Sequence, residues 1–200
     1  MLDGLLVDLV PFDKTYYDET MYAQWNDASR WWAMIGDYGP VSRAQVRAIQ
    51  GHRAAGRERG YTGVHFMIRA KDGKRIGSTG LNWVDNTNRS AMFGIWIAEA
   101  DYRAGGHGTD AITLLTDYAF NWLDVRRVWM ITMAINDGMK AVGERLGYKL
   151  EACGRDMTYA NGQWVDLLTY GIMQDEWLGR EVLVEKLGLR AKAEQRYGAD

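Results

Sequence analysis

The sequence predicts an α+β domain with a mixed, mostly antiparallel sheet and one crossover connection. Two observations support this fold class. Strand-like runs at 63–70, 74–84 and 90–98 follow one another through short polar turns, as in an antiparallel meander. A helical run at 109–123 then connects the third strand to another at 126–134, which indicates a strand–helix–strand unit. The chain has 200 residues, 47% of them hydrophobic, and can bury one core.

The N-terminal part is predicted to form a strand followed by two helices. The strand is expected at 5–12. The run at 14–34 has helical spacing, with three large side chains four residues apart on one face: Tyr17, Met21 and Trp25. A second helix over 42–60 is expected to begin after Ser42, a residue type that caps helix N-termini.

The middle of the chain carries the clearest local signals. The strands at 63–70 and 74–84 flank "KDGK", and an Asp-Gly turn between two such runs is typical of a β-hairpin. The helix at 109–123 is predicted to bury one face that carries Ile112, Leu115, Ala119 and Trp122.

The C-terminal part adds a short helix at 137–148, closed by a glycine, and a late strand at 164–173. A charged helical tail is expected over 175–200. No repeat or linker divides the chain, so we expect one domain over 1–200.

Composition excludes several classes of function. The 24 basic and 26 acidic residues give a net charge of −2, so nucleic acid is not an expected partner. One cysteine and no His/Cys/Asp cluster predict no metal site. No apolar run is long enough to cross a membrane, so we expect a cytoplasmic protein without a membrane partner.

The charges are unevenly distributed along the chain. Residues 1–40 are mostly acidic, whereas residues 41–75 are mostly basic. Two interpretations remain open at this point. The charges can lie on solvated faces of successive elements, or the acidic segment can form the mouth of a site that attracts a cation.

A glycine-rich loop, "RAGGHG" at 103–108, precedes the long predicted helix. Glycines before a helix N-terminus let a phosphate approach the free backbone amides there. A P-loop would need Gly-Lys-Ser/Thr, but Thr109 follows the last glycine here. A dinucleotide-binding turn fits Gly106-x-Gly108-x-x-Ala111, yet the strands before it look antiparallel, which opposes that interpretation.

The same loop matches the R-x-x-G-x-G pyrophosphate motif of GNAT acyltransferases. Over about residues 75–177 the chain resembles the RimJ/RimL-type branch of GNAT N-acetyltransferases. The matching positions include Asn136, Gly147-Tyr148, Arg155, Gly162, Asp166 and Glu176-Trp177. The resemblance implies a GNAT fold, with about seven strands, a splayed parallel pair and flanking helices. It also implies acetyl-CoA as co-substrate and an N-acetyltransferase activity.

The resemblance places acetyl-CoA on particular residues. Its pyrophosphate would lie on Arg103 and on the loop residues Ala104, Gly105, Gly106, His107, Gly108 and Thr109. The thioester would lie beside Trp96 and Ile97, one of whose amides stabilises the oxyanion. Asn136 would reach the pantetheine arm or cap the next helix, and Lys140 would approach the adenosine end or solvent.

The resemblance is less complete at the positions of the catalytic residues. The resemblance implies direct attack by the acceptor amine, but Gly143 and Met139 stand where the family commonly has a tyrosine and a serine. Tyr148, and less so Tyr159, are substitutes for the proton donor, with a core aromatic as the other interpretation of Tyr148. Three carboxylates are candidates for the base, each with a surface or turn role as the alternative: Glu99, Asp85 and Asp27.

The acceptor is expected to be a primary amine: a protein N-terminal α-amine, a polyamine or an aminoglycoside. Aromatic faces beside carboxylates suit such a cation. The candidate substrate-binding residues are Trp25, Asp27, Trp31, Trp32, Trp83 and Asp85. A non-catalytic CoA-binding module of the same fold is the alternative function. The family also suggests a homodimer, with the tail at 181–196 as a contact.

Overall fold

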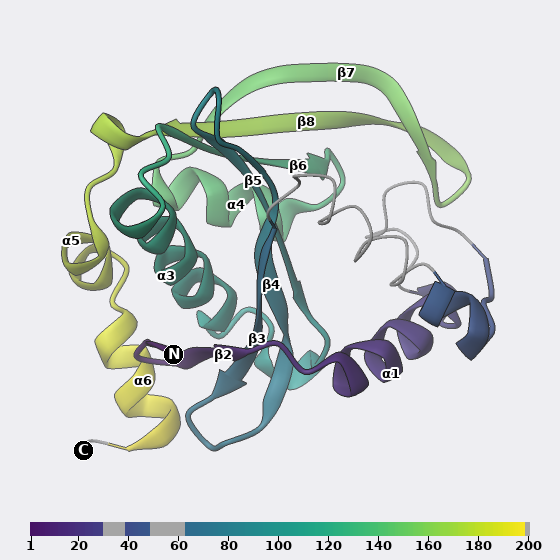
Figure 1. Ribbon diagram of the computed structural model, residues 1–200, viewed down its shortest axis with the longest axis horizontal. Coiled ribbons are helices and arrows are strands. Elements are labelled where there is room, and N and C mark those ends of the chain that lie inside the picture. Colours follow the sequence, from purple (N-terminus) through teal and green to yellow (C-terminus); the bar gives the residue numbers. More distant parts are fainter. Residues whose placement is uncertain (30–38, 49–62, 199–200) are drawn as a thin grey trace.

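One mixed sheet organises the computed structural model, which describes residues 1–29, 39–48 and 63–198 (Figure 1). Its eight strands lie in the order β1-β2-β3-β4-β5-β6-β8-β7. Neighbouring strands are antiparallel except β5 and β6. The strands are β1 (Leu2–Asp3), β2 (Val7–Pro11), β3 (Val64–Ala70), β4 (Arg75–Asp85), β5 (Ser90–Ile97), β6 (Arg127–Met133), β7 (Lys149–Ala160) and β8 (Gln163–Met173).

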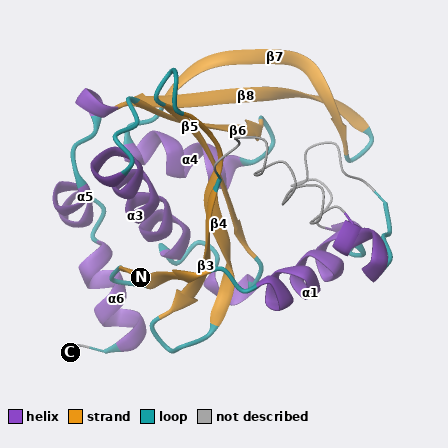
Figure 2. Cartoon of the chain, viewed as in Figure 1, coloured by secondary structure: helices purple, strands orange, loops and turns teal. Residues whose placement is uncertain are grey.

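The sheet separates two groups of helices (Figures 1 and 2). One face carries α3 to α6, and α1 lies on the other. A further helical stretch covers 43–48. The helices are α1 (Lys14–Trp25), α3 (His107–Trp122), α4 (Asp137–Leu146), α5 (Arg180–Lys186) and α6 (Leu189–Tyr197), with short 3-10 turns η2 (Ala100–Tyr102) and η3 (Gln174–Glu176).

The predicted fold class and parallel pair are confirmed, with eight strands in place of about seven. Two edge strands were not predicted, the two-residue β1 and the long β7, whose side chains are mostly exposed. A strand without a buried face carries no alternation of apolar and polar residues to reveal it.

Several element boundaries differ from the prediction. Helix α1 ends at Trp25, so residues 26–29 of the predicted run lie beyond it, and residues 30–34 lie outside the described residues. Ser42 does begin the next helix, since its Oγ accepts from the backbone N of Gln45 at 3.2 Å. The tail forms two helices and not one, because the chain turns at Gly188, where φ is +60°.

The core face of α3 is largely as predicted. Ile112, Leu115 and Ala119 are at most 1% exposed. Trp122, predicted to share that face, is 77% exposed. At 100° per residue it lies only about 20° around the helix from the buried Leu115, so its angular position does not account for the exposure. Trp122 is the last residue of the helix, beyond its buried part, and the prediction for Trp122 is wrong.

The β3–β4 hairpin forms around the predicted Asp-Gly turn. The N–H of Gly73 donates to the carbonyl of Ala70 at 2.9 Å, and the N–H of Ala70 donates to that of Lys74 at 2.8 Å. Gly73 has a φ of +87°, a left-handed value that glycine adopts without steric cost.

A buried carboxylate ties the N-terminal strands to α3. Asp110 lies in the first turn of α3 and is 0% exposed. Its Oδ2 accepts from three successive backbone N–H groups, those of Leu5 at 2.9 Å, Leu6 at 2.7 Å and Val7 at 3.1 Å. These three amides enter β2, so one side chain fixes the start of α3 against that strand.

Removing this carboxylate is expected to destabilise the protein strongly. Asp110→Ala leaves three backbone donors without their acceptor and should lower the free energy of unfolding by about 3 kcal/mol or more. Asp110→Asn keeps one acceptor oxygen and should cost less. Denaturant titration of both variants checks this, and equal losses would contradict it.

The two variants should also differ in their pH dependence. Burial raises the pKa of Asp110 above its ordinary value of 3.8, so the folded state holds this proton more tightly than the unfolded chain. Relative to Asp110→Asn, the natural protein should therefore lose stability as the pH rises from below 3.8 through the folded-state pKa.

Candidate functional site

The parallel strands β5 and β6 part after a short paired stretch. They pair only at Ser90–Arg127, Ala91–Val128 and Met92–Trp129. Beyond this point β5 continues to Ile97, still paired with β4 but not with β6. Among the described residues, the second half of β5 therefore has one open edge, which agrees with the splayed pair that the resemblance implies.

The direction of the backbone amides follows from the pairing with β4. The N–H of Ala98 donates to the carbonyl of Ile76 on the β4 side at 2.8 Å. Because amides alternate in direction along a strand, the N–H of Trp96 also faces β4, whereas that of Ile97 faces the open edge. Of the two predicted amides, Ile97 is thus the one available to a ligand.

The glycine loop leads into the N-terminus of α3 beside this open edge. Ala104 and Gly106 both have left-handed φ values, +60° and +94°. Gly106 is the N-cap and no side chain caps the helix, so the N–H groups of residues 107–109 have no partner within it. A Cβ on Gly108 would lie 3.8 Å from the Ile97 side chain, which places the first turn of α3 against the end of β5.

Side chains within and before the loop hold its position. Arg103 donates from Nε to the carbonyl of Ile97 at 3.0 Å and from Nη2 to that of Ala98 at 2.9 Å. Tyr102 donates from its hydroxyl to Asp72 in the β3–β4 turn at 2.6 Å. Arg103 therefore fastens the loop to β5, and its predicted contact with a pyrophosphate stays a prediction.

His107 does not line the loop with its ring. The ring is 2% exposed and lies between Tyr102 and Tyr197, and its Nε2 is 2.8 Å from the Tyr197 hydroxyl. Burial lowers the pKa of His107. The ring is therefore turned away from the helix end, and a contact of His107 with the pyrophosphate would have to use its backbone N–H.

Two predicted cofactor-binding residues begin helix α4. Asn136 caps it, since its Oδ1 accepts from the N–H of Met139 at 3.1 Å. Lys140 pairs with Asp137 at 2.7 Å, and this hydrogen bond raises the pKa of Lys140. The capping interpretation of Asn136 is confirmed, and the contacts of both residues with CoA stay predictions.

Tyr148 is a core residue. It is 3% exposed, its ring meets Phe93 edge to face at 5.6 Å, and its hydroxyl bonds to Thr116 Oγ1 at 2.7 Å. Burial raises its pKa well above the ordinary range. The hydroxyl is thus engaged inside the core, and the prediction of Tyr148 as proton donor is corrected.

The three carboxylates predicted as bases each have a local structural partner. Glu99 pairs with Lys74 at 2.6 Å, on the β4 side of β5 and away from its open edge. Asp85 accepts from the backbone of residues 87 and 88 and from the side chain of Asn88, which lowers its pKa. Asp27 accepts from Ser29 at 2.6 Å. The turn interpretation is confirmed for Asp85. Glu99 and Asp27 bond to neighbouring side chains, and a role of either as the base stays a prediction.

The predicted aromatic acceptor site is only partly assembled. Trp25 is 2% exposed and packs with Met21 and Val46, and this cluster also takes the side chain of Trp96. Trp83 is 40% exposed and meets Trp129 edge to face at 6.0 Å. Packing thus accounts for Trp25, whereas Trp83 remains accessible. Trp31 and Trp32 lie outside the described residues.

Three acidic residues of the N-terminal segment form ion pairs with the basic segment that follows it. The ion pairs that link the two are Asp8 with Arg69 and Lys71, Asp13 with Arg75, and Glu19 with Arg43. These ion pairs join β2 and the N-cap of α1 to the β3–β4 region, and α1 to the helical stretch at 43–48. An acidic mouth is not formed by these described residues.

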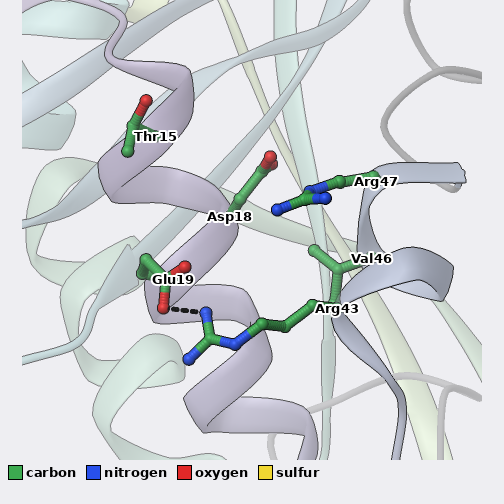
Figure 3. A pocket seen from close by; sticks show the side chains of 6 residues that line it. All are labelled: Thr15, Asp18, Glu19, Arg43, Val46 and Arg47. Carbon is green, nitrogen blue, oxygen red and sulfur yellow. Dashed lines mark hydrogen bonds and ion pairs between the residues drawn. The ribbon is translucent and has the colours of Figure 1, made fainter.

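A small pocket of about 150 Å³ lies between α1 and the helical stretch at 43–48. Figure 3 shows Arg47 extending toward Asp18, beside the Arg43–Glu19 pair. The residues lining it are Thr15, Asp18, Glu19, Arg43, Val46 and Arg47. Two arginines balance two carboxylates, so the pocket does not favour a cation by charge. It belongs to α1, across the sheet from the glycine loop.

The described parts of the chain show neither a metal site nor a membrane span. No three side chains of His, Cys, Asp or Glu gather there as metal ligands would. No helix among those residues combines the length and apolar character that crossing a membrane requires.

The family model described as "Acetyltransferase (GNAT) domain" matches residues 7–149. The chain belongs to the GNAT acetyltransferase family. Its match to the "Putative ribosomal N-acetyltransferase YdaF" of Bacillus subtilis (strain 168) is 36% identical over 110 residues, 55% of this chain and 60% of YdaF. Its match to the spermidine N(1)-acetyltransferase of Escherichia coli (strain K12) is 27% identical and covers 54% of this chain and 57% of that enzyme.

Less than two thirds of either GNAT relative is therefore matched. A crystal structure of spermidine N-acetyltransferase from Vibrio cholerae, in complex with CoA and spermine, superposes with a TM-score of 0.75. That comparison covers 87% of this chain and 99% of the other at 17% identity, which supports the fold alone.

The core placement of Tyr148 has a direct consequence for catalysis. Tyr148→Phe removes the bond to Thr116 and should lower the free energy of unfolding by about 1 kcal/mol. The rate of acetyl transfer to an accepted amine should stay within about twofold, since the mutation removes no reacting group. Comparison of kcat for the two proteins at saturating acetyl-CoA checks this, and a hundredfold loss would restore Tyr148 as the proton donor.

Proposed function

We propose that this GNAT protein transfers an acetyl group from acetyl-CoA to a primary amine. One observation carries the proposal: the N-terminus of α3, whose N-cap Gly106 has no capping side chain, packs beside Ile95 and Ile97, in the half of β5 that has separated from β6. An anion site and an unpaired strand edge in contact fit the two chemically different halves of CoA, a diphosphate and an amide-bearing arm.

The diphosphate would accept hydrogen bonds from the N–H groups of residues 107–109. The positive end of the α3 dipole favours such an anion, and Gly108 leaves room beside these amides. The amides of the pantetheine arm would pair with the open edge of β5 as an added strand does. Asn136 and Lys140 begin α4, and we propose that they flank the arm and the adenosine end.

The reaction needs a neutral amine in line with the thioester carbonyl. A C–N bond forms, the C–S bond breaks, and the proton lost by the amine nitrogen passes to solvent. The N–H of Ile97 faces the gap and can donate to the carbonyl oxygen as it gains negative charge. CoA leaves as a thiolate, and since a thiol has a pKa of about 8.5, water can return its proton without a tyrosine.

The acceptor we propose is a protein N-terminal α-amine or a polyamine. YdaF is named for ribosomal acetylation and the Escherichia coli relative for spermidine, and both match this chain. The non-catalytic CoA-binding module is the second candidate. It is favoured by the position of Tyr148 in the core and by Gly143, which is buried in α4 where the family commonly has a tyrosine.

A thiol-release assay with acetyl-CoA distinguishes these functions. We expect turnover with either N-terminal peptides or spermidine, and an aminoglycoside serves as a third class of amine. Mass spectrometry of the product should show one added acetyl group on nitrogen. CoA binding by calorimetry without turnover on any amine would instead support the non-catalytic module.

The anion site can be tested at Gly108 with two side chains of nearly equal size, one charged and one neutral. Gly108→Glu places a carboxylate beside the proposed diphosphate and should weaken acetyl-CoA binding at least about tenfold more than Gly108→Gln. Gly108 suits this test better than Gly106, where φ is +94° and a side chain would strain the backbone. Equal affinities of the two variants in calorimetry would contradict the assignment.

A further inference from the structure

The C-terminal helix α6 lies directly behind the glycine loop. A Cβ on Gly106 would come within 3.0 Å of Leu6, 3.3 Å of Lys192 and 3.6 Å of Leu189. The last two of these side chains belong to α6. Helix α6 therefore packs on the loop at Gly106, next to the amides of residues 107–109 that are proposed to bind the diphosphate.

One side-chain hydrogen bond links α6 to the first residue of α3. Tyr197, in the last turn of α6, has its hydroxyl 2.8 Å from Nε2 of His107. The two rings meet edge to face with centroids 6.1 Å apart, and the ring of Tyr102 also meets the His107 ring edge to face, at 5.1 Å. The buried His107 ring thus contacts both tyrosines.

The backbone N–H of the same His107 is one of the amides proposed to bind the diphosphate. The preceding backbone is strained at Ala104, a residue other than glycine with a left-handed φ of +60°, and such a conformation persists only where its surroundings enforce it. A fixed His107 ring fixes the direction of the first helical amide, so the ligand need not order it on binding.

We infer that Tyr197 is a positioning residue for acetyl-CoA, acting through His107 to hold the amides at the start of α3 in their binding orientation. The inference rests on the proposed function, because it assumes that these amides bind the diphosphate. It assigns α6, which lies beyond the family match at residues 7–149, a part in cofactor affinity.

Tyr197→Phe tests this with the loss of one oxygen atom. The Kd for acetyl-CoA should rise about three- to tenfold, as expected for one neutral hydrogen bond. The KM for acetyl-CoA should rise in parallel, while the KM for the amine and kcat stay unchanged, which a general loss of stability would not produce.

Tyr16→Phe is the matched control. Tyr16 also donates a single 2.8 Å hydrogen bond, to the carbonyl of Arg75, and lies in α1 on the other face of the sheet. Both variants should lower the melting temperature to a similar degree, yet only Tyr197→Phe should weaken acetyl-CoA binding. An equal Kd for both would show that α6 only packs on the loop.

A double-mutant cycle decides whether the effect passes through His107. His107→Ala should weaken acetyl-CoA binding, and adding Tyr197→Phe should weaken it no further. Additive losses would overturn the inferred route. If the natural protein bound no acetyl-CoA, the proposed function would fail, whereas binding that Tyr197→Phe leaves unchanged would overturn only the inference.

Discussion

The early separation of β5 from β6 is the constraint on which the rest of the site depends. Three residue pairs hold the strands together, and beyond them no described strand pairs with this edge of β5. Unpaired strand amides inside a sheet are costly unless something satisfies them. The GNAT fold retains this cost where α3 begins, so that a strand edge and a helix N-terminus meet in one place.

Four segments distant in sequence hold that meeting point. Asp110 accepts hydrogen bonds from the amides that lead into β2, and Tyr102 donates one to the β3–β4 turn. Arg103 donates to the end of β5, and the His107 ring bonds to Tyr197 of α6. Each anchor uses a side chain and leaves the backbone amides of residues 107–109 unoccupied. The side chains of the loop are therefore held by the protein, while its backbone amides stay available to a ligand, as a preorganised anion site requires.

The local parts of this arrangement were predictable from the sequence, and the anchors were not. The Asp-Gly hairpin, the glycine loop and the buried stripe of α3 each depend on residues close together in the chain. Asp110 and His107 have partners about a hundred residues away, so the residues next to them in the sequence could not predict these contacts. Tyr148 shows the same limit: its position after α4 was evident, but the direction of its ring depends on Phe93 and Thr116. The charge asymmetry was a real signal whose meaning, ion pairs between successive segments, required the fold.

The central claim is that CoA lies across α3 and the open edge of β5. A crystal structure of the protein with CoA tests it most directly. We expect diphosphate oxygens about 3 Å from the backbone nitrogens of residues 107–109. We also expect the pantetheine arm alongside β5 beyond Met92. CoA bound elsewhere, or a protein side chain capping α3 with CoA present, would contradict the account.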